Sequence, residues 1–360
     1  MSIRLLRAAD CSLEEFRAVV EVETDPTTAP HAATIDHEVP VYDASTALAA
    51  DRDVLLPELA SVLHDGPGIL VLRGVMSDAA VDAASDVFER IIAEEKAAGG
   101  PSGDHFAKPG ANDRIWNAHE KLCRADPEVY VDYVSNEALS LVPLAWLGPG
   151  YQITTQVNVV NPGGAAQSPH RDYHLGFLTD PEAEQYLSHV HRLSPALTLQ
   201  GAVAHCDMPV ETGPTMYLPH SQKYEAGYVA WRRPEFIEYF AEHKVQLAVG
   251  KGDAVWFNPA LFHAAGENVT SDVRRMANLF QVCSAFTQAM ERLDRAAMVE
   301  LVEPILAERW ADPAARPALR AAAAATADGY AFPGNLDEDQ PTDGLAPPSQ
   351  LARLLARLEG

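Results

Sequence analysis

A histidine and a carboxylate stand two residues apart in His170-Arg171-Asp172, inside a stretch whose pattern indicates strands. Residues i and i+2 of an extended strand point to the same face, so this imidazole and this carboxylate would be presented together. They are two of the three ligands of a 2-His-1-carboxylate facial triad, which leaves positions on iron open for a cosubstrate and oxygen. The third ligand would have to be a distant histidine.

Two other histidine patterns could also hold a metal. His205-Cys206-Asp207 repeats the HxD spacing, and His189-Val190-His191 is an HxH pair of the kind that some cupins use. The chain has 13 His, so such triplets arise readily by chance. Any one of them could be a strand-end histidine with a neighbouring partner. The spacing alone therefore leaves all three patterns open.

A lone histidine and an arginine downstream favour the first pattern. His263 follows an expected strand, where a turn begins, and Arg274 lies eleven residues later at the start of the next expected strand. In an antiparallel meander this spacing returns the arginine to the side of the histidine. An iron site that binds 2-oxoglutarate needs such a fork-shaped donor for the distal carboxylate. We therefore expect His170, Asp172 and His263 to bind Fe(II) and Arg274 to bind 2-oxoglutarate, with the neighbouring Arg275 turned to solvent.

Polar side chains on an adjacent strand are the next candidates for contacts to the cosubstrate. Residues 152–159 (QITTQVNV) alternate strictly between polar and apolar types, which predicts a strand with one polar face. If that face lines a barrel, it brings Gln156 and Asn158 to 2-oxoglutarate or to a substrate. An ordinary solvent-facing strand would show the same pattern. Asn278 falls on the same expected face as Arg274.

Contacts to a substrate would come from two places. The Gly/Pro-rich loop 99–112 and the segment after it could form a lid, because loops of this length are often functional. The two residues directly after Asp172 could line the substrate pocket. Each of these side chains could equally belong to a solvated surface. The candidates are Lys108, Arg114, Trp116, Asn117, Tyr173 and His174.

Short strands dominate the middle of the chain. Gly, Pro and Asp turns separate most of them, and many short strands in one stretch favour a sandwich or jelly roll over a parallel α/β sheet. Helical patterns stand on both sides, at 78–97 with Ser77 as N-cap, at about 126–146 and at 288–309. Beyond 152–159, the expected strands are 197–204, 215–218, 245–249, 254–257 and 276–282.

The length fits one domain better than two independent ones. The chain has 360 residues, and we expect an α+β protein with a mainly β core. Its expected parts are N-terminal strand and helical support over 1–150, the core with the metal site over 151–285, and a C-terminal helical extension over 286–360.

Composition limits the partners. The formal net charge is −24, and so acidic a surface repels nucleic acid and anionic membranes, which leaves a small molecule as the expected substrate. Four Cys without a CxxC motif indicate reduced, packed thiols. Neither a secretory signal nor an apolar run of about 18 residues is present, so a cytoplasmic location is expected. The oligomeric state stays open.

At these residues the sequence resembles the phytanoyl-CoA dioxygenase family of Fe(II)/2-oxoglutarate oxygenases. His170, Asp172, His263 and Arg274 meet the family's pattern of HxD, distal His and an Arg eleven residues later. The segments GPGILVLRGV, HAAGENVTSDVRR and HCDMPVETGPTMYLPHSQK also resemble family signatures, and the last makes Asp207 a structural residue. The resemblance covers roughly residues 60 to 285.

The resemblance implies a double-stranded β-helix (a cupin-like jelly roll) flanked by N- and C-terminal helices. It also implies hydroxylation of an unactivated C–H bond of a small metabolite by O2, coupled to decarboxylation of 2-oxoglutarate to succinate and CO2. Thr212, His220 and Ala265 depart from the usual family residues, whereas the retained Asp172 disfavours a halogenase. Desaturation, epimerisation or ring formation could use the same iron. The alternative is a cupin-type barrel in which His189, His191 and His205 bind a metal, acting as an isomerase or binding protein.

Overall fold

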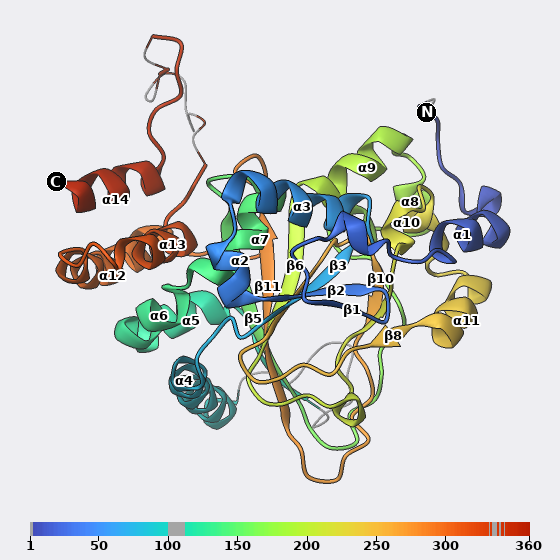
Figure 1. The fold of residues 1–360 in the computed structure, drawn as a ribbon, viewed down its shortest axis with the longest axis horizontal. Helices are drawn as coiled ribbons and strands as arrows, with labels where there is room; N and C mark the ends of the chain where they lie inside the picture. The colour runs from blue at the N-terminus through green and yellow to red at the C-terminus, as the bar shows by residue number, and fades with distance from the viewer. Residues whose placement is uncertain (1–2, 100–111, 331, 333–336, 338–339, 342) are drawn as a thin grey trace.

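The computed structural model describes residues 3–99, 112–330, 332, 337, 340–341 and 343–360 (Figure 1). Within these residues, eight strands form a large sheet in the order β1-β2-β3-β9-β6-β11-β5-β4, and three form a small sheet in the order β10-β7-β8. The strands are β1 Thr34–Asp36, β2 Val39–Asp43, β3 Ile69–Arg73, β4 Asn112–Ile115, β5 Gln152–Val160, β6 Thr198–Ala204, β7 Met216–Leu218, β8 Val245–Gln246, β9 Ala254–Phe257, β10 Phe262–Ala264 and β11 Arg275–Cys283.

The large sheet has an apolar face and a cavity face. β5 and β11 pair antiparallel over nine residues, from Val160 opposite Arg275 to Gln152 opposite Cys283. Alternate side chains of both strands, such as Val157 and Phe280, pack into the main hydrophobic core. The side chains of the other parity line a cavity that the small sheet also lines. This arrangement of two sheets around a cavity confirms the expected jelly-roll core of an α+β protein.

Helices cover the apolar face of the large sheet. Most of the helical side chains in the main core come from α3 to α7 and from the C-terminal α12 to α14. In Figure 1, α4 to α6 and α12 to α14 lie to the left of the strands and α3 runs across their upper end, whereas α1, α10 and α11 lie to the right. The helices are α1 Leu13–Val20, α2 Ala44–Ala49, α3 Arg52–His64, α4 Asp78–Ala97, α5 Ala118–Ala125, α6 Pro127–Val134, α7 Glu137–Leu147, α8 Asp180–Ala183, α9 Ser188–Ala196, α10 Gly227–Ala230, α11 Pro234–His243, α12 Arg295–Arg309, α13 Arg316–Thr326 and α14 Gln350–Glu359. Within the described part of the chain, no helix is long and apolar enough to cross a bilayer.

Capping explains where several helices begin. The Ser77 hydroxyl accepts a hydrogen bond from the Ala80 amide at 3.3 Å, so α4 starts where its N-cap predicted. The C-terminal helix expected from residue 288 begins only at Arg295, because the Asp294 side chain caps it by accepting from the Ala297 amide. The single helical region expected at 126–146 is two helices, α6 and α7, separated at Ser135 and Asn136.

The HxD segment differs from its expected form. Residues 168–172 are not part of a regular strand, and only an isolated antiparallel bridge joins His170 to His263 in β10. Pro169 has no backbone N–H to donate, so a continuous hydrogen-bonded ladder cannot form across this segment.

Candidate metal centre and its cavity

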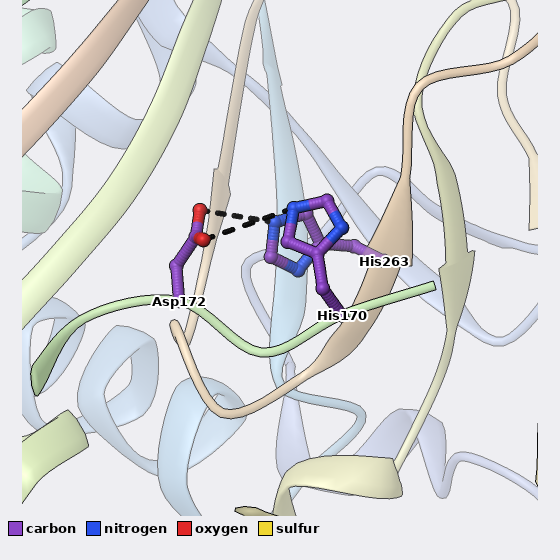
Figure 2. Close-up of side chains that lie close together, drawn as sticks. All are labelled: His170, Asp172 and His263. Carbon is purple, nitrogen blue, oxygen red and sulfur yellow. Dashed lines mark ion pairs between the residues drawn. The ribbon is translucent and has the colours of Figure 1, made fainter. Parts of the chain in front are cut away.

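His170, Asp172 and His263 form one compact cluster, as the sequence predicted. Each offers one ligand atom, and these atoms lie within 4.8 Å of one another. The Nε2 atoms of His170 and His263 lie 3.8 Å and 3.5 Å from the two carboxylate oxygens of Asp172. Figure 2 shows the two imidazoles side by side, both facing that carboxylate. Two imidazole nitrogens and one carboxylate are the donor set of a facial triad for Fe(II).

Backbone hydrogen bonds hold the three residues in place. The His170 amide donates to the His263 carbonyl at 2.9 Å, and the His263 amide donates back at 3.2 Å. The Asp172 amide donates to the Pro259 carbonyl at 3.1 Å. The cluster is therefore built on a two-residue bridge between segments that lie about ninety residues apart in the sequence.

Each histidine is held in the tautomer that a metal requires. The Nδ1 atoms of His170 and His263 lie 3.1 Å and 2.9 Å from the carbonyls of Ser168 and Leu261. A carbonyl only accepts, so each Nδ1 carries a hydrogen, and Nε2 is the ring nitrogen that can give up its proton and offer a lone pair to a metal. Such partners orient a metal-binding histidine and raise its basicity.

Asp172 is held as a carboxylate. Burial would raise its pKa, but the interaction with His170 and hydrogen bonds from His263 and Gln200 outweigh this and lower the pKa below its usual value. The Gln200 Nε2 donates to Oδ2 of Asp172 at 2.5 Å. The Tyr228 hydroxyl donates to the backbone carbonyl of Asp172 at 3.3 Å. These contacts fix both the charge and the direction of the third ligand.

The cluster faces a cavity of about 220 Å³ between the two sheets. Gln156 and Asn158, which the sequence placed on the barrel face of β5, line this cavity, and so do Arg114 and Trp116. Arg114 donates to the Gln156 side chain, and its guanidinium carbon lies 4.6 Å from the centre of the Trp116 ring. The side chain of Asn158 accepts from Asn112. These four candidates therefore belong to the site, although their roles remain proposals.

The structure places Arg274, the expected arginine, outside the cavity and its neighbour Arg275 inside it. The Arg274 side chain is 45% exposed and pairs with Glu89 and Asp113 at 2.9 Å and 3.5 Å, outside the cavity. Arg275 is only 5% exposed and lines the cavity. Along β11 the cavity-lining residues have odd numbers and the core residues even ones, so Arg275 is on the face that reaches the cavity. Asn278, with the even residues, donates to the Tyr133 hydroxyl on the helical side.

Arg275 is a buried cation without a carboxylate partner among the described residues. Burial lowers its pKa to about 10, while the nearby Cys206 and Tyr217 raise it. Asp253, the second carboxylate of the cavity lining, accepts from the Gly74 and Gly250 amides instead. A buried charge without a counter-charge is costly. The cavity is therefore suited to receive an anion at Arg275.

Three further substrate candidates, Asn117, Tyr173 and His174, are not among the residues that line the cavity. Asn117 donates its side-chain amide to Glu120 and its backbone amide to Glu291. Tyr173 is buried outside the lining, and His174 meets the Ser194 hydroxyl at 2.9 Å. The backbone at both residues has a positive φ, so the chain turns sharply away directly after Asp172. Lys108 lies outside the described residues.

The rival histidine patterns are structural. The ring nitrogens of His205 contact the hydroxyls of Ser85 and Tyr133, both at 2.8 Å, and burial lowers the pKa of His205 to about 3. Asp207 accepts from the Lys251 amide in a turn, as the resemblance implied. The HxH pair lies on α9 rather than on a strand. The metal site of the cupin alternative is therefore not assembled.

Sequence reasoning missed several polar residues of the cavity. Gln200, Gln281 and Gln167 line it, together with the apolar Phe177 and Met290. Gln200 and Gln281 stand at positions whose apolar neighbours, Leu199 and Phe280, belong to the main core. The same alternation that identified the polar face of β5 would have found both glutamines.

Known proteins resemble this chain through one family model and several solved structures. No curated protein sequence matches the chain. Three solved structures are similar to this chain. HygX from Streptomyces hygroscopicus with nickel and 2-oxoglutarate bound has 16% identity, with 65% of this chain and 90% of that chain covered and a TM-score of 0.44. AviO1 from Streptomyces viridochromogenes Tue57 has 18% identity, coverages of 61% and 90% and a TM-score of 0.44, and the carbocyclase SnoK from nogalamycin biosynthesis has 18% identity, coverages of 71% and 92% and a TM-score of 0.46. Likenesses this distant leave the reaction of the present chain open. The family model of phytanoyl-CoA dioxygenase (PhyH) matches residues 65–276, more than half of the chain. The chain therefore belongs to the phytanoyl-CoA dioxygenase family of Fe(II)/2-oxoglutarate-dependent oxygenases.

Proposed function

We propose that this protein is a dioxygenase that hydroxylates an unactivated C–H bond of a small molecule, with conversion of 2-oxoglutarate to succinate and CO2. The observation that carries the proposal is Arg275. A buried guanidinium without a carboxylate partner among the described residues lines the same cavity as the His170, Asp172 and His263 cluster. A metal site alone would not need that cation, whereas a dianionic cosubstrate does.

The residues of the site would have three roles. His170 and His263 supply neutral nitrogens, and Asp172 supplies one negative charge, which together would hold Fe(II) and leave part of its coordination sphere open. Arg275 would bind the distal carboxylate of 2-oxoglutarate through a two-pronged hydrogen bond. Gln156 and Asn158 lie on β5, which pairs with β4 on one side and β11 on the other, and their side chains would contact cosubstrate or substrate.

The bound iron and 2-oxoglutarate, with O2, supply the oxidant that breaks the substrate C–H bond. The protein's own contribution is position and exclusion of water. Gln200 holds the Asp172 carboxylate in one orientation, and the buried walls of the cavity keep the reacting carbon in a dry site. The retained carboxylate leaves no vacant ligand position for a halide, which favours hydroxylation over halogenation.

The test of this proposal begins without oxygen. Fe(II) and 2-oxoglutarate added anaerobically to the full chain are expected to give a visible charge-transfer absorption band. Asp172→Ala removes a metal ligand and is expected to lose the band and all succinate formation. Asp207→Ala, which alters the rival HxD motif, is expected to lower thermal stability while the band persists.

Aerobic product analysis then tests hydroxylation itself. Metabolites are screened for substrate-dependent succinate release, and the product of a hit is analysed after reaction under ¹⁸O2. One labelled oxygen in the product supports hydroxylation. A product that has gained no oxygen would replace hydroxylation by desaturation, epimerisation or ring formation. A well-folded protein without the absorption band would refute the dependence on 2-oxoglutarate.

A further inference from the structure

Two buried glutamines form an unusual wall of the cavity. Gln200 in β6 and Gln281 in β11 are directly opposite partners in the antiparallel ladder, so their side chains share one face and lie next to each other. Both line the cavity, and they are only 3% and 7% exposed. The Oε1 atom of each is buried and has no hydrogen-bond partner among the described residues.

The direction of the Gln200 amide is fixed by chemistry. Its partner, the Asp172 carboxylate, can only accept, so the atom 2.5 Å from Oδ2 must be the NH2 group. The carbonyl oxygen of the same amide is then held beside the metal ligand, as an acceptor. An unsatisfied buried acceptor costs roughly as much as a lost hydrogen bond. A ligand that supplies two donors would remove this cost.

The glutamines lie at the opposite end of the cavity from the cosubstrate arginine. Gln281 and Arg275 share one face of β11 but are six residues apart, about 20 Å along the strand. The 2-oxoglutarate proposed at Arg275 therefore leaves the glutamine end for the substrate. Arg114, the other cation of the lining, already donates to Gln156 and stacks on Trp116.

We propose that Gln200 and Gln281 are substrate-binding residues, and that the substrate is a neutral or cationic molecule that presents hydroxyl or amino donors to these two oxygens beside Asp172. The inference rests on the proposed function, whose cosubstrate occupies the other end of the cavity. Two carbonyl oxygens attract donors and repel anions. A fatty acyl chain, which has no donor near the carbon that reacts, would leave both oxygens unsatisfied.

The first test needs no ligand. Gln281→Met removes an unsatisfied acceptor at similar side-chain length, so the thermal midpoint of the ligand-free protein is expected to rise. Gln152→Met is the matched control. Gln152 is also 7% exposed and on a paired strand, but it lies outside the cavity lining and donates to the Thr287 carbonyl. This control is expected to lower the midpoint, as loss of a structural contact does.

The second test uses myo-inositol, glucosamine and the uncharged ester methyl octanoate as probes, because an anionic probe would bind at Arg275 instead. Binding is followed by tryptophan fluorescence of the metal-free protein, because Trp116 lines the cavity. This readout needs neither iron nor 2-oxoglutarate, so its result is independent of the charge-transfer band that tests the proposed function. Myo-inositol or glucosamine is expected to bind, with about a five- to tenfold loss in Gln281→Met for one hydrogen bond. Gln281→Glu keeps an acceptor and is expected to retain the binding of glucosamine.

The relative affinity of the first two probes distinguishes a hydroxyl from an amino substrate. Preference for methyl octanoate, or equal binding by Gln281→Met and the unaltered protein, would overturn the proposal. If no probe binds, the thermal midpoints decide: a rise in Gln281→Met beside a fall in Gln152→Met supports the proposal, and any other pattern overturns it.

Discussion

Replacing the two adjacent arginines one at a time shows whether 2-oxoglutarate binds to the arginine in the cavity or to the one at the surface. Arg275→Met and Arg274→Met remove the same charge from adjacent residues, the first residue of β11 and the residue just before it, and keep a long side chain. Arg275 is buried in the cavity with no carboxylate partner among the described residues, whereas Arg274 is half exposed and pairs with Glu89. The two variants therefore remove the same charge from the cavity in one case and from the surface in the other.

The magnitudes follow from burial. A bidentate, charge-assisted contact in a buried site costs about 3–5 kcal/mol to break. At about 1.4 kcal/mol per tenfold, Arg275→Met should weaken 2-oxoglutarate binding by roughly two to three and a half orders of magnitude. An exposed ion pair such as Arg274–Glu89 contributes about 0–1 kcal/mol, so Arg274→Met should change the affinity less than about fivefold.

The assay is an anaerobic titration of Fe(II)-loaded protein with 2-oxoglutarate, followed by the charge-transfer band. Thermal unfolding of the ligand-free variants serves as the folding control. Arg275→Met is expected to unfold no earlier than the unaltered protein, because it removes a buried charge without a counter-charge. A larger loss of affinity in Arg274→Met, or equal losses in both, would refute the assignment of the cosubstrate site to the cavity face.

Two further predictions concern stability. In Gly201→Ala, the new Cβ would collide with the buried ring of Trp256, so we expect destabilisation by about 1–3 kcal/mol, measured by denaturant unfolding; unchanged stability would contradict the packing of β6 on β9. The pKa of His205 is about 3 in the folded protein because of burial and about 6.5 when unfolded. Between pH 3 and pH 6.5 the unfolded chain binds more protons at this residue than the folded protein does. The contribution of neutral His205 to the free energy of unfolding is therefore fully present above pH 6.5 and decreases as the pH is lowered, by about 2 kcal/mol at pH 5. His205→Gln should make the unfolding free energy less dependent on pH over this range, and an unchanged slope would contradict the prediction.

The features that the sequence predicted correctly depend on residues that are close together along the chain. The alternation in residues 152–159 identified β5 and its polar face, because buried apolar side chains of one parity must meet the helices. Ser77 identified the start of α4 through a local contact. The three metal-ligand candidates were found because one pair is close in sequence and the third is bracketed by turns. Each of these signals depends on neighbours along the chain.

The backbone of the HxD segment could not be predicted from neighbouring residues alone. His170 and Asp172 were expected to share a strand face, yet they are placed by single hydrogen bonds to His263 and Pro259. These partners lie almost a hundred residues away, so no local pattern could specify the bridge. The prediction of the cluster was right although the expected strand was wrong.

The error at the arginines has a definite physical cause. Counting eleven residues from His263 assumes a regular path, but residues 265–274 form an irregular connection in which the Asn268 side chain donates to the carbonyls of Val160 and Val273. A slip of one residue in such a loop moves every side chain of the next strand to the other face. Counting backwards within β11 avoids the loop: Phe280 must face the core, so Gln281 and therefore Arg275, six residues earlier, must face the cavity. The strand's own large apolar side chains thus determine which arginine can meet an anion, and the spacing from the distal histidine does not.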